Sequence, residues 1–160
     1  MTWQMRKANQ HDLESIMAIE SAVFLTDAWS EATMSAELAS PLGYYLVAFP
    51  PGSPEQIDGY AGLFAPVGAE HADIQTIAVA ETARRRGLGR ALVRILVAEA
   101  RSRGASELFL DVRTDNPSAQ NLYRDLGFEQ IAVRKAYYRP DGVDAIVMRL
   151  QIPEARVEPA

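Results

Sequence analysis

Apolar residues recur at helical spacing in four parts of the chain, and these parts predict four helices. The predicted helices cover residues 10–22, 30–40, 87–104 and 116–127. The third has the clearest apolar face, formed by Leu88, Leu92, Ile95 and Leu96. Ser30 and Asn116 are typical N-cap residues, and Pro117 favours the first helical position. The two shorter helices therefore have their own start signals in addition to their apolar spacing.

Alternating patterns and apolar runs between these helices predict seven strands. They cover residues 2–8, 44–49, 60–67, 72–79, 106–112, 128–138 and 144–150. Residues 50–59 are rich in proline and glycine and are expected to form a loop. The chain shows no internal repeat and no linker, so we predict one α+β domain over residues 1–152 around a mixed sheet. Residues 153–160 are expected to form a loose C-terminal tail.

The composition excludes several kinds of site. The 160 residues include no cysteine, which excludes disulfides, thiolate metal sites and a cysteine nucleophile. Because there are only two histidines, a multi-histidine metal site is not expected, and we predict no metal. The first ten residues lack the apolar core of a signal peptide, and no apolar run approaches the ~18 residues that a membrane span needs. We therefore expect a soluble, cytoplasmic protein with no membrane partner.

The net charge of −5 is distributed unevenly along the chain. Residues 1–83 hold eleven acids and two basic residues, a net charge of −9. Residues 84–160 hold ten acids and fourteen basic residues, a net charge of +4. This asymmetry favours an anion bound at one side of the domain and a cation at the other. A mixed surface charge that only keeps the protein soluble is the simpler interpretation, and the motifs must separate the two.

The basic residues begin abruptly in residues 84–93, which read RRRGLGRALV and follow a predicted strand. A helix N-terminus exposes backbone N–H groups and carries about half a positive charge. Gly87 and Gly89 lack the Cβ atoms that would keep a phosphate away from these amides, so the segment suits a pyrophosphate. It lacks the lysine of a Walker loop and the third glycine of a dinucleotide fingerprint. A pI of about 5.1 argues against nucleic-acid binding, and a solvated arginine cluster is the alternative.

The order Arg84-x-x-Gly87-x-Gly89 after the strand residues IAV resembles the acetyl-coenzyme A (acetyl-CoA) loop of the GNAT superfamily of N-acetyltransferases. The resemblance implies a GNAT fold, with a mixed, mostly antiparallel sheet of six to seven strands, about four flanking helices, and a splay at the acetyl-CoA site. It implies that pantetheine is bound by the strand residues Ile77, Ala78 and Val79. It also implies that the pyrophosphate is held by the loop and helix start, at Arg85, Arg86, Gly87, Leu88, Gly89 and Arg90.

A second segment, LFLDVRTDNPSAQNLYRDLGF at residues 108–128, resembles the same family independently. Within the family it is similar to the RimI-type ribosomal-protein-alanine N-acetyltransferases. The pieces AWSEATMSAEL and RKAYYRPDGVDAIVMRL match this branch as well, so the resemblance covers about residues 5–150. The glycine segment alone indicates the superfamily, whereas these pieces indicate the branch.

This resemblance implies roles for three residues. Tyr123 matches the family's general acid, which contacts the coenzyme and protonates the departing thiolate, although its helix position also suits a core tyrosine. Asn116 matches a coenzyme-contacting residue and is also explained as a helix cap. Asp111 stands where the branch carries a glutamate proposed as the base. Because aspartate is shorter, we hypothesise that Asp111 acts through a water or holds the cationic amine; a carboxylate paired with Arg113 is the structural alternative.

The resemblance also implies where the acceptor binds. Phe24, Leu25 and Trp29 would form one side, and Tyr137 and Tyr138 the other, because aromatic walls can hold a flexible N-terminus; simple packing explains Trp29 nearly as well. The expected activity is acetyl transfer from acetyl-CoA to a protein N-terminal amine, foremost the N-terminal alanine of the eighteenth small-subunit ribosomal protein. The alternative acceptors are another protein N-terminus, a lysine or a small amine. A further alternative is that the protein is a non-catalytic module. The expected partner is a basic ribosomal protein, without direct nucleic-acid binding, and the expected state is a monomer or weak dimer.

Overall fold

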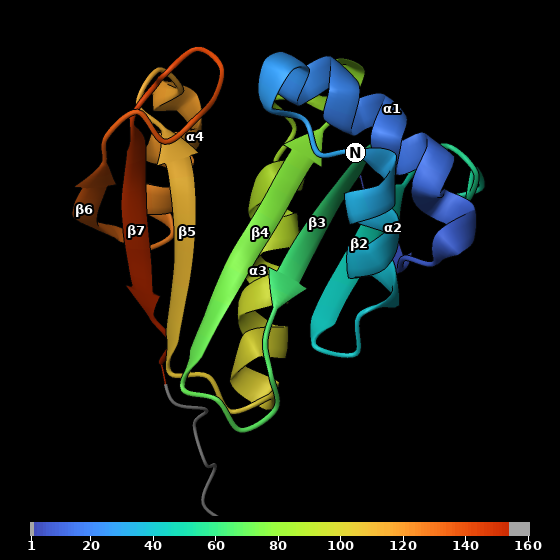
Figure 1. Cartoon of the computed structure of the whole chain (residues 1–160). Helices are drawn as coiled ribbons and strands as arrows, with labels where there is room; N and C mark the ends of the chain where they lie inside the picture. The colour runs from blue at the N-terminus through green and yellow to red at the C-terminus, as the bar shows by residue number, and fades with distance from the viewer. Residues whose placement is uncertain (1, 154–160) are drawn as a thin grey trace, which may run out of the picture.

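The chain folds around a sheet of seven strands in the order β1-β2-β3-β4-β5-β7-β6 (Figure 1). The computed structural model describes residues 2–153. Its strands are β1 (Gln4–Lys7), β2 (Gly43–Phe49), β3 (Gly59–Phe64), β4 (His71–Val79), β5 (Glu107–Arg113), β6 (Glu129–Arg134) and β7 (Ala145–Gln151). Every neighbouring pair is antiparallel except β4 and β5, which are parallel. The expected GNAT arrangement, mixed and mostly antiparallel, is thereby confirmed.

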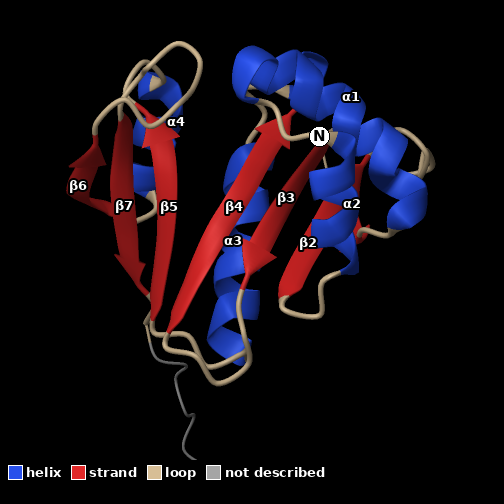
Figure 2. Cartoon of the chain, viewed as in Figure 1, coloured by secondary structure: helices blue, strands red, loops and turns tan. Residues whose placement is uncertain are grey.

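Helices cover both faces of the sheet (Figures 1 and 2). α1 (Leu13–Phe24) and α2 (Glu31–Ala39) lie on one face, and α3 (Leu88–Ser102) and α4 (Pro117–Asp125) lie on the other. Three short 3-10 helices are η1 (Gln10–Asp12), η2 (Leu25–Asp27) and η3 (Glu81–Ala83). Within residues 2–153, no helix is long and apolar enough to cross a membrane. The predicted domain limits stay a prediction, since 154–160, most of the predicted tail, lie outside the described residues.

The predicted helix starts are confirmed by their hydrogen bonds. The Ser30 hydroxyl accepts from the Thr33 backbone N–H at 3.1 Å and caps α2. The Asn116 side chain accepts from the Ala119 backbone N–H at 3.2 Å and caps α4. Each cap satisfies one of the N–H groups that a helix start leaves without an intrahelical partner.

Two apolar clusters hold the layers together. Leu88, Leu92 and Leu96 of α3 are buried against the sheet, as the spacing predicted. In β2, Leu46 and Ala48 belong to this cluster, whereas Tyr45 and Val47 belong to the cluster under α1 and α2. This division is the alternation expected of a strand that is covered on both faces. The two clusters therefore make β2 and β3 a rigid support for the neighbouring strand β4.

β4 and β5 separate after a short stretch of pairing. Their parallel ladder joins His71–Asp73 of β4 to Glu107–Phe109 of β5. Beyond Asp73, β4 pairs only with β3, and beyond Phe109, β5 pairs only with β7. Figure 2 shows the two strands diverging toward their C-terminal ends. This confirms the expected splay in the sheet and places the ends of β4 and β5 on opposite sides of an opening.

Candidate active site

A cleft of about 740 Å³ fills the opening between β4 and β5. Its walls come from six parts of the chain: the end of α1 with η2, the second half of β4, the segment that leads into α3, the end of β5, the first turns of α4, and the loop between β6 and β7. Side chains of β5 that face away from the apolar cluster under α3, such as Asp111 and Arg113, reach this cleft. The separation of β4 and β5 therefore creates a candidate binding site between them.

The β4 wall leads directly into the glycine segment. Ile77, Ala78 and Val79 line the cleft, and Arg84 donates from Nε to the Val79 carbonyl at 3.2 Å. Gly87 precedes α3 with φ of 84°, in the left-handed region that glycine adopts without strain. Gly89 in the first turn of α3 lines the cleft, so the helix start, whose first N–H groups have no intrahelical partner, borders it.

Gly89 faces the cleft at a point where a side chain would meet both walls. A Cβ atom there would lie 3.3 Å from Leu122 Cδ2 and 4.0 Å from Val79 Cγ2. At Gly87 the same Cβ would meet nothing within 4 Å. The two glycines thus serve different needs: Gly87 permits the backbone turn, and Gly89 keeps the space between β4 and α4 open.

The structure brings together only part of the predicted coenzyme set. Lining the cleft are Ile77, Ala78, Val79, Gly89, Asn116 and Tyr123. Outside this lining are Arg85, Arg86, Gly87, Leu88 and Arg90. Leu88 is in the core, and the Arg90 guanidinium lies 3.5 Å from the Asp125 carboxylate of α4. Arg84, which the prediction assigned only to the loop pattern, lines the cleft and so joins the candidate site.

Tyr123 combines a core position with access to the cleft. Its ring packs edge-on against Phe128, with centroids 5.8 Å apart, and only 6% of the residue is exposed. Burial raises the pKa of its hydroxyl, so the group carries its proton at neutral pH. Among the described residues, no fully buried side-chain oxygen lacks a hydrogen-bond partner, and no protein partner is seen for this hydroxyl. The hydroxyl is therefore accessible, and the cleft is the space it borders.

Asp111 lies on the β5 wall with its side chain 29% exposed. Its carboxylate lies 3.5 Å from Arg134 Nε of β6, so the alternative in which it pairs with Arg113 is wrong. Asp73 of β4 is close enough to feel this charge: burial, and next the charge of Asp111, raise the pKa of Asp73. Asp111 and Asp73 therefore lie near each other where the β4–β5 ladder ends, and Arg134 offsets part of their charge.

The predicted acceptor residues gather at the mouth of the cleft. Phe24, Leu25, Trp29 and Tyr138 line it, whereas Tyr137 does not. Tyr137 instead packs edge-on against Tyr138, with centroids 5.2 Å apart, and is 49% exposed. Leu25 is 74% exposed with φ of 49°. Burial, and next the charge of Asp111, raise the pKa of Tyr138.

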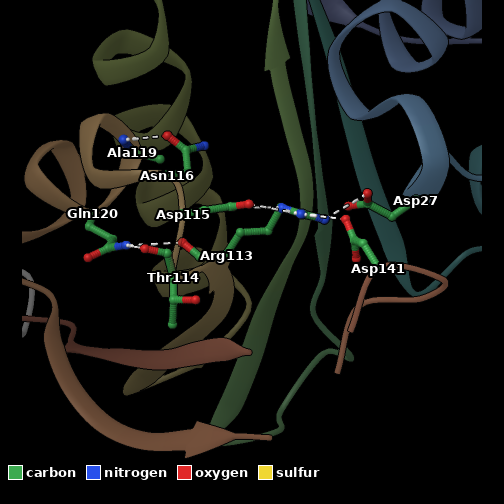
Figure 3. Close-up of polar contacts among 8 residues, drawn as sticks. All are labelled: Asp27, Arg113, Thr114, Asp115, Asn116, Ala119, Gln120 and Asp141. Carbon is green, nitrogen blue, oxygen red and sulfur yellow. Dashed lines mark hydrogen bonds and ion pairs between the residues drawn. The ribbon is translucent and has the colours of Figure 1, made fainter. Parts of the chain in front are cut away.

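Sequence reasoning missed a cluster of charges centred on Arg113, which we call the Arg113 cluster (Figure 3). Its other members are Asp27 of η2, Asp115 after β5, and Asp141 in the loop between β6 and β7. Hydrogen bonds from the guanidinium lower the pKa of Asp115 and of Asp141. The LDVR run placed an arginine at a strand end, but no local pattern indicated three carboxylate partners.

Glu20 is a second residue that sequence reasoning missed. It lies on α1, is 1% exposed, and lines the cleft. Its carboxylate accepts from the Trp29 backbone N–H at 2.9 Å and from the hydroxyls of Tyr60 and Thr76. The available signal was an acidic residue inside the apolar run MAIESAVF, since a buried carboxylate requires donors.

Comparison with known proteins gives a consistent picture. Residues 13–128 match the Acetyltransferase (GNAT) family, and the chain belongs to this family. It is 36% identical over 141 residues to N-alpha-acetyltransferase RimI of Mycobacterium tuberculosis. This match covers 86% of this chain and 85% of that protein. It is 44% identical over 85 residues to the [ribosomal protein bS18]-alanine N-acetyltransferase of Escherichia coli, covering 52% of this chain and 57% of that protein.

The fold resembles a solved structure over nearly its whole length. The crystal structure of the ribosomal-protein-S18-alanine N-acetyltransferase from Escherichia coli superposes with a TM-score of 0.84 and 31% identity. The match covers 97% of each chain. Within the described residues, no group of three or more histidine, aspartate or glutamate side chains is arranged to hold a metal ion. The site must therefore be interpreted from its backbone amides, its tyrosine and its carboxylates.

Proposed function

We propose that this protein transfers the acetyl group of acetyl-CoA to the N-terminal α-amine of another protein. The observation that carries the proposal is the cleft itself, which has backbone amides of the α3 start at one end and aromatic loops at the other. A cleft lined by both kinds of feature would hold two substrates that meet between them. Membership of the acetyltransferase family supports acetyl transfer as the reaction, with acetyl-CoA as the donor.

The donor fits the β4 side of the cleft. Beyond Asp73, the edge of β4 that faces β5 has no strand partner, so its backbone groups are available to the amides of a pantetheine chain. The start of α3 offers N–H groups and a positive dipole end to a pyrophosphate. Gly89 supports this fit because a Cβ there would narrow the passage between Val79 and Leu122. Asn116 and Tyr123 would contact the coenzyme from α4.

The chemistry needs one neutral amine and one proton donor. An α-amino group has a pKa near ~8, so a nearby carboxylate or water need remove only one proton for it to attack. The amine nitrogen forms a bond to the thioester carbonyl carbon, and the carbon–sulfur bond then breaks. Asp111, directly or through a water, would take the ammonium proton before the attack. The Tyr123 hydroxyl would then protonate the departing thiolate, and the second proton that the nitrogen loses as the amide forms would restore the Tyr123 hydroxyl. A free backbone N–H of β4 would stabilise the oxyanion.

We propose that the foremost acceptor is the N-terminal alanine of ribosomal protein bS18. The proteins of similar sequence and fold in Escherichia coli, named for this activity, support the assignment. The net charge of −9 over residues 1–83 favours a basic protein as the acceptor, as ribosomal proteins are. The same proposal places the enzyme in the cytoplasm, as a monomer or weak dimer, without direct binding to nucleic acid.

Mass spectrometry of acetylated peptides tests the proposal. The protein and acetyl-CoA are incubated with a peptide that begins with the bS18 N-terminal sequence and contains an internal lysine. We expect the mass of one acetyl group to be added, and fragmentation to place it on the alanine α-amine. A matched peptide with a formylated N-terminus is the control and should stay unmodified.

Three results would overturn the assignment. Acetylation of the lysine in both peptides would make the enzyme a lysine acetyltransferase. Faster acetylation of peptides beginning with serine or methionine would keep the reaction and change the acceptor. Coenzyme A binding without transfer to any amine would indicate a non-catalytic module.

A further inference from the structure

We propose that Arg113 is a positioning residue that fixes the two acceptor loops across the open end of the cleft. The inference rests on the proposed function only in taking an acceptor peptide as the ligand of the two loops. The contacts of Arg113 with both loops are a property of the fold. Arg113 lines the cleft at the end of β5 and lies outside the glycine segment at residues 84–93.

The contacts of Arg113 use three different directions of its guanidinium (Figure 3). Nη1 donates to Asp27 Oδ1 at 2.9 Å, and Nη2 donates to Asp141 Oδ2 at 2.7 Å. Nε and Nη2 also donate to the two carboxylate oxygens of Asp115, at 2.9 and 3.0 Å. Charge-assisted bonds of this length, made by a planar fork, define both distance and direction.

The partners of Arg113 lie on opposite sides of the splay. Arg113 is the last residue of β5, at the end where β5 and β4 are farthest apart (Figure 2). Asp27 belongs to η2, which follows α1 on the β4 side and carries Leu25. Asp141 belongs to the loop between β6 and β7, which also carries Tyr138. One side chain therefore connects the two halves of the sheet where no strand pairing does.

The arginine is itself held in place. The Gln120 side chain, 8% exposed on α4, donates to the backbone carbonyls of Arg113 and Thr114 at 3.0 and 3.2 Å. The guanidinium lies 5.1 Å from the centroid of the Tyr138 ring, a tyrosine that lines the cleft. Only 20% of the Arg113 side chain and 16% of the Asp27 side chain are exposed. Solvent therefore screens this pair less than an ordinary surface pair.

The consequence is a preformed acceptor mouth. With Arg113 in place, the loop with Leu25 and the loop with Tyr138 have fixed positions before any peptide arrives, so the peptide does not have to order them. Lysine cannot replace this arginine, because the guanidinium makes four hydrogen bonds from three separate nitrogens, whereas an ammonium has three donors on a single nitrogen. Loss of the tie should weaken use of the acceptor and leave use of acetyl-CoA nearly intact.

Hydrogen–deuterium exchange of the free protein tests the tie without any reaction. We expect Arg113→Met to speed exchange in residues 24–29 and in residues 137–143. Asp27→Ala removes only the contact across the cleft, so it should speed exchange in residues 24–29 alone. This milder variant should fold even if Arg113→Met does not. Glu99→Ala is the matched control, since it removes a comparably buried pair, 3.1 Å long, between Glu99 of α3 and Arg103 at the C-cap, and neither residue lines the cleft. Unchanged exchange in both loops of the Arg113 and Asp27 variants would overturn the proposal.

Steady-state kinetics then separates positioning from general damage. For Asp27→Ala and Arg113→Lys we expect the KM for an acceptor peptide to rise about tenfold, with the KM for acetyl-CoA changed by less than about twofold. An equal rise in both constants would mean a general loss of structure and would overturn the positioning role. If the unmodified enzyme acetylated no peptide, the proposed function would fail, and the exchange experiment would still decide on the tie.

Discussion

The two ends of the cleft are built by different means. At the coenzyme end, the features that matter are the unpaired edge of β4, the left-handed turn at Gly87 and the missing side chain at Gly89. At the acceptor end, the loops are held by side chains that come from distant parts of the chain, above all Arg113 with Asp27 and Asp141. One end is made by backbone geometry and the other by charge.

This difference matches what each substrate demands. A pyrophosphate and a pantetheine present the same groups in every reaction, so main-chain donors can recognise them without depending on any one side chain. An acceptor peptide is one of many competing N-termini, so side chains must select it. The coenzyme end should therefore be damaged mainly by adding atoms, and the acceptor end mainly by removing charges. Substitutions at five residues test this contrast.

Tyr123→Phe should give the largest effect, because it removes the only ionisable side chain of α4 that lines the cleft. We expect kcat to fall about 100-fold or more, the usual range for loss of a general acid. Thermal stability should change little, since phenylalanine keeps the packing against Phe128. Steady-state kinetics and thermal melting measure both, with Tyr44→Phe, away from the cleft, as the control. A kcat equal to that of the unmodified enzyme would assign Tyr123 to the core alone.

Gly89→Val should weaken coenzyme binding by roughly tenfold or more, because its side chain would take up the space between Val79 and Leu122 that the coenzyme is proposed to enter. Arg84→Ala removes a charge and the bond to the Val79 carbonyl but adds no atoms, so its effect should be smaller. Isothermal titration with coenzyme A compares the two dissociation constants. If the arginine variant lost more affinity, charge and not backbone access would govern this end of the cleft.

Asp111→Asn should lower kcat/KM for the acceptor by about tenfold and alter the pH profile, because a carboxylate beside the amine would be lost. Asp111→Glu restores the charge with a longer reach and should keep at least the original rate. Rates across a range of pH with one acceptor peptide are the measurement. An asparagine variant with an unchanged rate and profile would remove Asp111 from the mechanism and leave it as the partner of Arg134.

Asp125→Asn should have the smallest effect. The pair between Arg90 and Asp125 is 3.5 Å long, and 67% of the aspartate side chain is exposed, so its loss should change the free energy of unfolding by less than about 0.5 kcal/mol. Because Arg90 lies in the first turn of α3, its release should leave coenzyme affinity equal or slightly stronger. Chemical denaturation and titration with coenzyme A measure these quantities. A marked loss of affinity would show that Asp125 itself supports the coenzyme end.

The coenzyme end could be predicted from the sequence because its determinants are local. Caps, glycines and apolar spacing act within a few residues, so the starts of α2 and α4 and the core face of α3 were found where expected. The mixed sheet and its splay were expected from the family resemblance, and the structure confirms both. The roles of the site residues stay predictions until the kinetics are measured.

The acceptor end could not be predicted in the same way. Arg113 and Asp27 are 86 residues apart, and their contact exists only because η2 and the end of β5 meet across the cleft. Glu20 was equally hidden, since the donors that justify its burial come from Trp29, Tyr60 and Thr76. Likewise, the partner of Arg90 on α4 could not be foreseen from the glycine segment. Long-range polar contacts depend on how the elements meet, and the local pattern contains no record of this.

The short ladder between β4 and β5 also has a mechanical meaning. Only three residue pairs of strand pairing join the two parts of the sheet, so along the cleft the sheet lacks the backbone hydrogen bonds that hold its other strands together. A ligand that bonds to the free edge of β4 and touches α4 would work as a splint across the cleft. The melting temperature should then rise with coenzyme concentration, as it does for any ligand that binds only the folded state. In this protein the donor substrate would be, for as long as it is bound, a structural part of the sheet.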